Sequence, residues 1–185
     1  MALDIQAIGM IEFNSIAAGI EAADVMLKSA GVQPLILKTI CPGKYLASVY
    51  SDVSSVESSV HAGLDLAGDS VVDHFVIPNI SPVVISAMTS SVDLISGSAV
   101  GIIETFSAAT SFISADAAVK ASNVDLIDVR LAMGLGGKGL VILSGDVAST
   151  ETAVEAGSSQ AALSGLLVRK TVITNISPQL LNYLL

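Results

Sequence analysis

The hexapeptide Ala7-Ile-Gly-Met-Ile-Glu12 returns 92 residues later as Ala99-Val-Gly-Ile-Ile-Glu104. The repetition continues further along the chain, because residues 43–63 match residues 137–157 at 10 of 21 positions after an insertion of two residues. A nearly constant offset over most of a chain is typical of a duplicated structural unit. The sequence therefore predicts one fold built twice.

The two copies agree best where each of them ends. Val76–Pro82 and Val172–Pro178 are identical at six of seven positions. With 185 residues in the chain, each copy has the size of a small domain. We expect a first domain over residues 1–94 and a second over residues 95–185, joined near Ser91–Ser98.

Within a copy, the hydrophobic pattern alternates between strand and helix spacing in the order β-α-β-β-α-β. In the first copy, residues 8–13 predict a short strand, and Asn14 or Ser15 is expected to cap the helix that follows. Asp24 and Lys28 are spaced to form an i,i+4 ion pair on that helix. The predicted buried stripe of this helix is Ile16, Ile20, Ala23, Leu27 and Ala30.

The second half of each copy supplies the remaining strands and a second helix. Residues 35–40 and 46–50 predict strands around the turn Cys41-Pro-Gly-Lys44, a helix begins near Ser54, and residues 76–78 close the sheet. The predicted inward positions of the other helices are Val56, Val60, Gly63 and Ala67, then Ala108, Phe112, Ala115 and Val119, then Thr150, Val154, Gly157 and Ala161. The fold class is therefore α/β, of the mixed α+β kind.

The composition indicates a protein that buries much of its surface against other subunits. Apolar residues make up 52% of the chain and charged residues 14%, against about 25% charged residues in a typical soluble domain. Such a balance suits a membrane or an oligomer. The longest uncharged stretch, residues 75–92, contains Pro78 and Pro82 and is a poor membrane-spanning helix. We expect an oligomer and no membrane partner.

Charge and cysteine content restrict the partners and the compartment. A net charge of −9 with eight Lys and Arg residues argues against binding to nucleic acid. A single cysteine, Cys41, and an N-terminus without a secretion signal predict a reducing cytoplasm. No nucleophile is spaced recognisably from a base and an orienting group, so we do not expect an enzyme.

These repeats resemble the shell domain of bacterial microcompartments, whose copies open with an A-x-G-x-I-E strand and a helix containing A-D-x-x-x-K. The matching residues are Ala7, Gly9, Ile11, Glu12, Ala23, Asp24 and Lys28 in the first copy and Ala99, Gly101, Ile103, Glu104, Ala115, Asp116 and Lys120 in the second. The resemblance implies a homotrimer that imitates a hexamer and tiles with other shell proteins. It also implies that Lys28 and Lys120 contact neighbouring tiles, whereas solvated ion pairs are the plainer interpretation.

The segment Lys38-Thr-Ile-Cys-Pro-Gly-Lys44 is similar to the cluster-binding segment of iron–sulfur shell proteins from propanediol-utilisation microcompartments. The resemblance implies that Cys41 thiolates from three subunits ligate one [4Fe-4S] cluster per trimer. The cluster would transfer electrons across the shell, with an encapsulated redox enzyme as a possible partner. Pro42, Gly43 and Lys44 would then line the central pore.

Cys41 also permits other interpretations. A lone cysteine in a cytosolic chain is often a small buried hydrophobic residue, which would leave a cluster-free tile with a metabolite pore. Repeats of β-α-β-β-α-β also build ferredoxin-like trimers that sense small molecules.

The remaining candidates carry weaker signals. Gly134–Gly139 is glycine-rich but lacks the following Ser or Thr and the strand-before, helix-after context of a phosphate loop, so we interpret it as a pore-side loop. Glu12 and Glu104 occupy equivalent positions, which favours a shared structural hydrogen bond over an acid–base pair. His61 and His74 have no ligand-spaced partner and predict surface or packing roles.

Overall fold

The computed structural model describes residues 5–89 and 97–184. The chain divides into two compact units, the first being Met1–Ile80 with Ala132–Gly137 and the second Ser81–Leu131 with Lys138–Leu185. The expected junction near Ser91–Ser98 lies largely outside the described residues, so the domain boundary at residue 94 stays a prediction.

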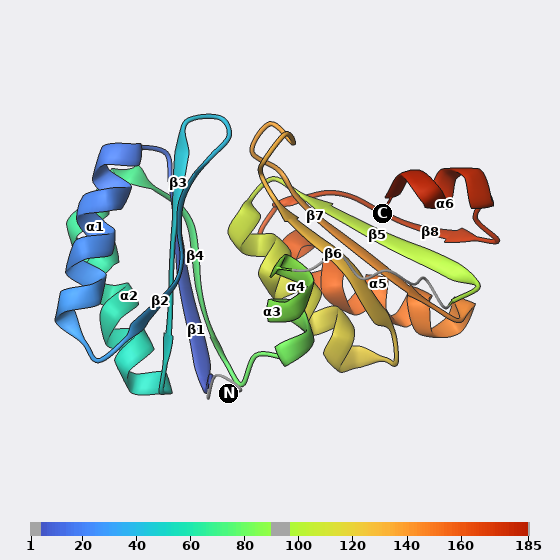
Figure 1. The fold of residues 1–185 in the computed structure, drawn as a ribbon, viewed down its shortest axis with the longest axis horizontal. Coiled ribbons are helices and arrows are strands. Elements are labelled where there is room, and N and C mark those ends of the chain that lie inside the picture. The colour runs from blue at the N-terminus through green and yellow to red at the C-terminus, as the bar shows by residue number, and fades with distance from the viewer. Residues whose placement is uncertain (1–4, 90–96, 185) are drawn as a thin grey trace. The chain divides into compact units, whose positions relative to one another are not determined.

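The first unit is a four-stranded antiparallel sheet with two helices packed on it (Figure 1). The strands lie in the order β2-β3-β1-β4, so that the first strand is central and β2 and β4 are the edges. The elements are β1 (Ala7–Phe13), α1 (Ile16–Ser29), β2 (Gln33–Ile40), β3 (Lys44–Ser51), α2 (Val53–Ala67), the 3-10 turn η1 (Gly68–Ser70) and β4 (Val71–Pro78).

The second unit repeats this topology with the order β6-β7-β5-β8. Its elements are α3 (Pro82–Thr89), β5 (Ala99–Thr105), α4 (Ala108–Ala121), β6 (Asp125–Leu131), β7 (Gly139–Gly145), α5 (Val147–Leu163), β8 (Leu167–Thr174) and α6 (Pro178–Leu184). The predicted β-α-β-β-α-β order is confirmed in both copies. Among the described residues, no helix is long and apolar enough to span a membrane.

Close contact between helices and sheet explains the small residues of the repeat. A Cβ atom built on Gly9 of β1 would lie 2.4 Å from Cγ2 of Val60 in α2. Real Cβ atoms do not approach a neighbour so closely, so glycine is needed where α2 crosses the central strand. The predicted inward positions Val56, Val60 and Gly63 of α2 are buried, as are Thr150, Val154, Gly157 and Ala161 of α5.

The predicted buried stripe of α1 is partly wrong. Ile16 and Ile20 are exposed, and the buried positions are Gly19, Ala22, Ala23 and Met26. The cause is the closeness of α1 to β3, since a Cβ on Gly19 would lie 2.7 Å from Cβ of Tyr45. Only small side chains fit beneath the helix at this point, and the isoleucines are therefore on its outer face.

Ser and Asp side chains cap the helices, as their positions indicate. Ser15 caps α1 by accepting a hydrogen bond from the backbone of Ala18, which settles the choice between Asn14 and Ser15. Asp52 caps α2, and hydrogen bonds from the hydroxyl and backbone N–H of Ser55, together with one from Ser54, lower the pKa of Asp52 to about 2. Asp146 caps α5 in the same way, and hydrogen bonds from Ser149 lower its pKa too.

Two helices, α3 and α6, were not expected from the sequence. Each begins with proline directly after serine, at Ser81-Pro82 and Ser177-Pro178. Serine is a favoured capping residue and proline is favoured at the first helical position. Ser177 does cap α6, since its Oγ accepts a hydrogen bond from the backbone of Leu180 at 3.2 Å.

Candidate functional site

The hairpin between β2 and β3 presents Cys41 to solvent. β2 ends at Ile40 and β3 begins at Lys44, so Cys41, Pro42 and Gly43 form the turn. The Cys41 side chain is a free, exposed thiol and is not buried in the core. The Cys41–Pro42 peptide is cis, and Gly43 has φ +72°, a left-handed conformation that favours glycine. The structure contradicts the interpretation of Cys41 as a small buried residue within one chain.

An ion pair fixes the base of this hairpin. Nζ of Lys44 donates to Oε1 of Glu12 at 2.7 Å, where the Glu12 side chain is fully buried and that of Lys44 is 17% exposed. The second copy has the same pair, Lys138 to Glu104, at 2.8 Å with exposures of 39% and 31%. The expected shared structural hydrogen bond of the two glutamates is therefore confirmed, with lysine as the donor.

The residues around Cys41 can be tested against the demands of a metal cluster. An iron–sulfur cluster is held by three or four cysteine thiolates, and this chain has one cysteine. Over the described parts of the chain, no group of three or more His, Cys, Asp or Glu side chains gathers in reach of one ion. A single chain therefore cannot hold the cluster. Symmetry-related copies meeting at Cys41 can, because the thiol is exposed at the tip of its hairpin.

The equivalent turn in the second copy differs in length and composition. It runs from Ala132 to Lys138 between β6 and β7, and contains no cysteine. Gly134, Gly136 and Gly137 all have positive φ. A strand and not a helix follows the turn, so Gly134–Gly139 lacks the context of a phosphate loop, and its interpretation as a pore-side loop stays a prediction.

The two predicted tile-edge lysines make the local ion pairs that their spacing indicates. Lys28 bonds Oδ2 of Asp24 at 2.6 Å, and Lys120 bonds Oδ2 of Asp116 at 2.5 Å. Their contact with neighbouring tiles stays a prediction, as do the pore positions of Pro42, Gly43 and Lys44. His61 and His74 are exposed, as expected, and Nδ1 of His61 lies 3.0 Å from Oδ2 of Asp65.

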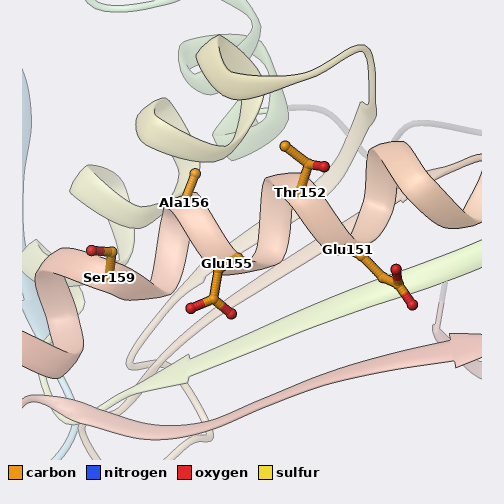
Figure 2. A pocket seen from close by; sticks show the side chains of 5 residues that line it. All are labelled: Glu151, Thr152, Glu155, Ala156 and Ser159. Atoms are coloured by element: carbon orange, nitrogen blue, oxygen red, sulfur yellow. The ribbon is translucent and has the colours of Figure 1, made fainter.

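The surface of α5 has a shallow hollow that offers no catalytic arrangement. It is lined by Glu151, Thr152, Glu155, Ala156 and Ser159, all from this one helix (Figure 2). Glu155 is engaged with Lys170 of β8. The side chains are spread along the helix instead of converging on one point, so the hollow does not resemble an active site.

Comparison with known proteins identifies the family. The sequence model of the BMC domain matches residues 7–80 and again residues 99–176. The bacterial microcompartment shell protein PduT of Citrobacter freundii is 48% identical over 168 residues, which cover 91% of each chain. The carboxysome shell protein CcmK2 of Synechococcus elongatus is 43% identical over 75 residues, which cover 38% of this chain and 74% of that protein.

A solved structure supports the same assignment. The crystal structure of a microcompartments protein from Desulfitobacterium hafniense superposes with a TM-score of 0.83 at 48% identity, covering 95% of this chain and 98% of that one. The two matches of the family model coincide with the two copies found in the sequence. The chain therefore belongs to the BMC domain family and is a tandem bacterial microcompartment shell protein, a structural component of a cytoplasmic shell and not an enzyme.

Proposed function

We propose that three copies of this chain close into a ring that serves as one shell tile, with their Cys41 hairpins gathered at the three-fold axis. Shell proteins of this family assemble with one another into oligomeric tiles. In a three-fold ring, each residue on the axis meets two equivalents. Three Cys41 thiolates would then hold one [4Fe-4S] cluster and leave one iron for another ligand.

The exposure of Cys41 at the hairpin tip is the observation that carries this proposal. A thiol at the end of two paired strands projects from the body of its unit, and the neighbouring residues are small or fixed in φ. Pro42 removes one backbone donor, and Gly43 allows another chain to approach closely. The hairpin is thus suited to contact its symmetry copies.

The difference between the two turns supports the same arrangement. The second copy has an insertion of two residues at this turn and no cysteine. If all six turns of a trimer were alike, six thiols would surround the axis, more than the three or four that one cluster uses. The duplicated chain offers three.

The residues of the hairpin would bind and position the group, and the group would supply one-electron transfer when bound. Cys41 provides the thiolates. Lys38, which is exposed on β2, adds positive charge near the anionic sulfur ligands. Lys44 holds the base of the hairpin through Glu12. The function that follows is the passage of electrons through the shell, with an enclosed redox enzyme as partner.

Anaerobic purification of the wild type beside Cys41→Ser tests the proposal. We expect a native mass of three chains for both proteins, with iron, sulfide and broad visible absorption in the wild type alone. Iron and absorption that persist in Cys41→Ser would contradict the role of Cys41. A trimer without iron, even after anaerobic reconstitution with iron and sulfide, would instead indicate a cluster-free tile with a metabolite pore.

The family assignment favours a tile over a small-molecule-sensing trimer. Electron microscopy at high protein concentration separates the two functions, because a tile forms sheets or tubes. A protein that remains discrete trimers and binds a nucleotide would overturn the wall-building function.

A further inference from the structure

Both copies of the repeat end in nearly the same sequence, but the helices that follow, α3 and α6, are packed differently. Ile80-Ser-Pro82 leads into α3, and Ile176-Ser-Pro178 leads into α6 at an offset of 96 residues. By sequence, α3 closes the first copy. By packing, it is part of the second unit, which begins at Ser81.

The packing of α3 is specific. It contacts β6 and α4, and it buries Val84 completely and Ala87 nearly so. The backbone N–H of Ser81, at the start of the helix, donates to Oδ1 of Asp116 in α4 at 2.8 Å. The helix is therefore held by an apolar contact and by one charge-assisted hydrogen bond.

Over its described side chains, the counterpart α6 is less deeply buried within its own unit. Leu180 is the equivalent of Val84, and it is 47% exposed, against 0% for Val84. Ile176 and Leu181 are only partly buried, against a patch formed by Val100, Ile127 and Ile142. The same helix position that is buried in α3 is thus half open in α6.

The first unit has the matching uncovered face. We call it the α1–β2 face, formed by Ile20 and Asp24 of α1 and Leu37 of β2. Offset by 92 residues, these correspond to Phe112, Asp116 and Val129. The Asp24 side chain is 58% exposed against 8% for Asp116, Ile20 is 53% exposed against 0% for Phe112, and Leu37 is exposed where Val129 is buried.

The carboxylates of Asp24 and Asp116 each bond a lysine one helical turn further along. Lys28 bonds Oδ2 of Asp24, and Lys120 bonds Oδ2 of Asp116. In the second unit, Oδ1 of Asp116 accepts the hydrogen bond from Ser81. By analogy with Asp116, an N–H donor equivalent to that of Ser81 would bond Oδ1 of Asp24. Ser177 carries that equivalent N–H.

We propose that α6 of one chain docks on the α1–β2 face of a neighbouring copy, as α3 docks on α4 and β6. Leu180 would be buried there, and the backbone of Ser177 would donate to Asp24. Because the docking segment and the face it binds lie on different copies of the repeat, the contact runs head to tail, which closes a ring where the rotation between copies is that of the proposed trimer. This docking rests on the proposed trimer, in which α6 would be the segment that joins neighbouring chains.

Cross-linking with a short bismaleimide tests the contact in the Cys41→Ser background. The interchain pair is Ser177→Cys with Asp24→Cys, and the matched internal control is Ser81→Cys with Asp116→Cys. Assemblies mixed from isotopically light and heavy chains show by mass spectrometry which chains are joined. We expect the first pair to join light with heavy chains and the control to react within each chain.

A second variant does not depend on cross-linking. Leu180→Asp places a charge on the docking side of α6, and we expect it to weaken trimer association at least about tenfold, because a buried unpaired charge is costly. Leu163→Asp, at an 81% exposed position of α5, is the matched control and should leave association unchanged.

The outcomes separate the two proposals. A trimer in which the control pair reacts but the Ser177–Asp24 pair does not, or reacts only within one chain, overturns the docking of α6 and leaves the trimer standing. A Leu180→Asp variant that associates like the wild type overturns it as well. A wild-type chain that stays monomeric overturns the trimer itself, and the docking with it.

Discussion

The two ion pairs at the bases of the hairpins offer an internally controlled test of burial. Lys44→Met and Lys138→Met remove the same donor from equivalent positions, but Glu12 is fully buried and Glu104 is 31% exposed. Loss of one partner from a buried pair costs about 3–5 kcal/mol, because the remaining charge stays desolvated. An exposed pair contributes about 0–1 kcal/mol.

We therefore expect Lys44→Met to destabilise the chain by about 3 kcal/mol, the lower end of that range, since Lys44 keeps some solvent contact. For a chain of this size, each kcal/mol shifts Tm by roughly 2–4 °C, so the loss corresponds to roughly 6–12 °C. Lys138→Met should lower Tm by no more than roughly 4 °C.

The assays are urea unfolding for the free energy and thermal unfolding for Tm, on both variants in a Cys41→Ser background, which removes any contribution from a bound metal. The double variant Glu12→Gln with Lys44→Met should recover part of the loss, because a neutral amide replaces the buried charge. Equal destabilisation by Lys44→Met and Lys138→Met would refute the reasoning that burial sets the energy of this pair.

Two further predictions follow from the helices. Gly9→Ala should destabilise the chain by about 1–3 kcal/mol in chemical denaturation, since the new methyl group would overlap Val60. The control Gly31→Ala should be tolerated, because no atom lies within 4 Å of the added Cβ, and equal losses in the two variants would contradict the packing of α2 on β1. Asp52→Ala should lower thermal stability at neutral pH. Because the pKa of Asp52 is lowered from an ordinary 3.8 to about 2 in the folded chain, its contribution to stability is present above about pH 4 and is lost as the pH falls towards 2. The melting temperatures of wild type and variant should therefore converge at low pH, and a difference that is independent of pH would contradict the cap.

The repeat and its periodicities were enough to predict the fold. The first strand was predicted to within one residue, because β1 is a central strand with seven consecutive buried residues, Ala7–Phe13, whereas β4 begins at Val71, five residues before the predicted start at residue 76. The buried face of α1 could not be predicted as well, because hydrophobicity alone places Ile16 and Ile20 on the inward face. The deciding information was the distance between α1 and β3, which admits only Gly19 beneath the helix. That distance is a tertiary property and not a local one.

The candidate site was predictable in part for a similar reason. The turn Cys41–Lys44 lies where the alternation of strands placed it, and the Glu12 position pointed to a structural bond. The donor to Glu12 was not predicted, because Lys44 is 32 residues away in sequence and meets it only through the pairing of β1 with β3. The helices α3 and α6 carried a local signal, serine followed by proline, that sequence reasoning missed.

The edge strand β2 has features that limit aggregation when many copies are packed into one shell layer. Pro34 has no backbone N–H to donate, and the register shifts between Pro34 and Ile36. Both features discourage strand-to-strand fibre growth. At the equivalent edge, β6 shifts register in the same way and carries Asp125, Asp128 and Arg130. Copies crowded together in one shell layer are therefore less prone to pair through their β2 and β6 edges.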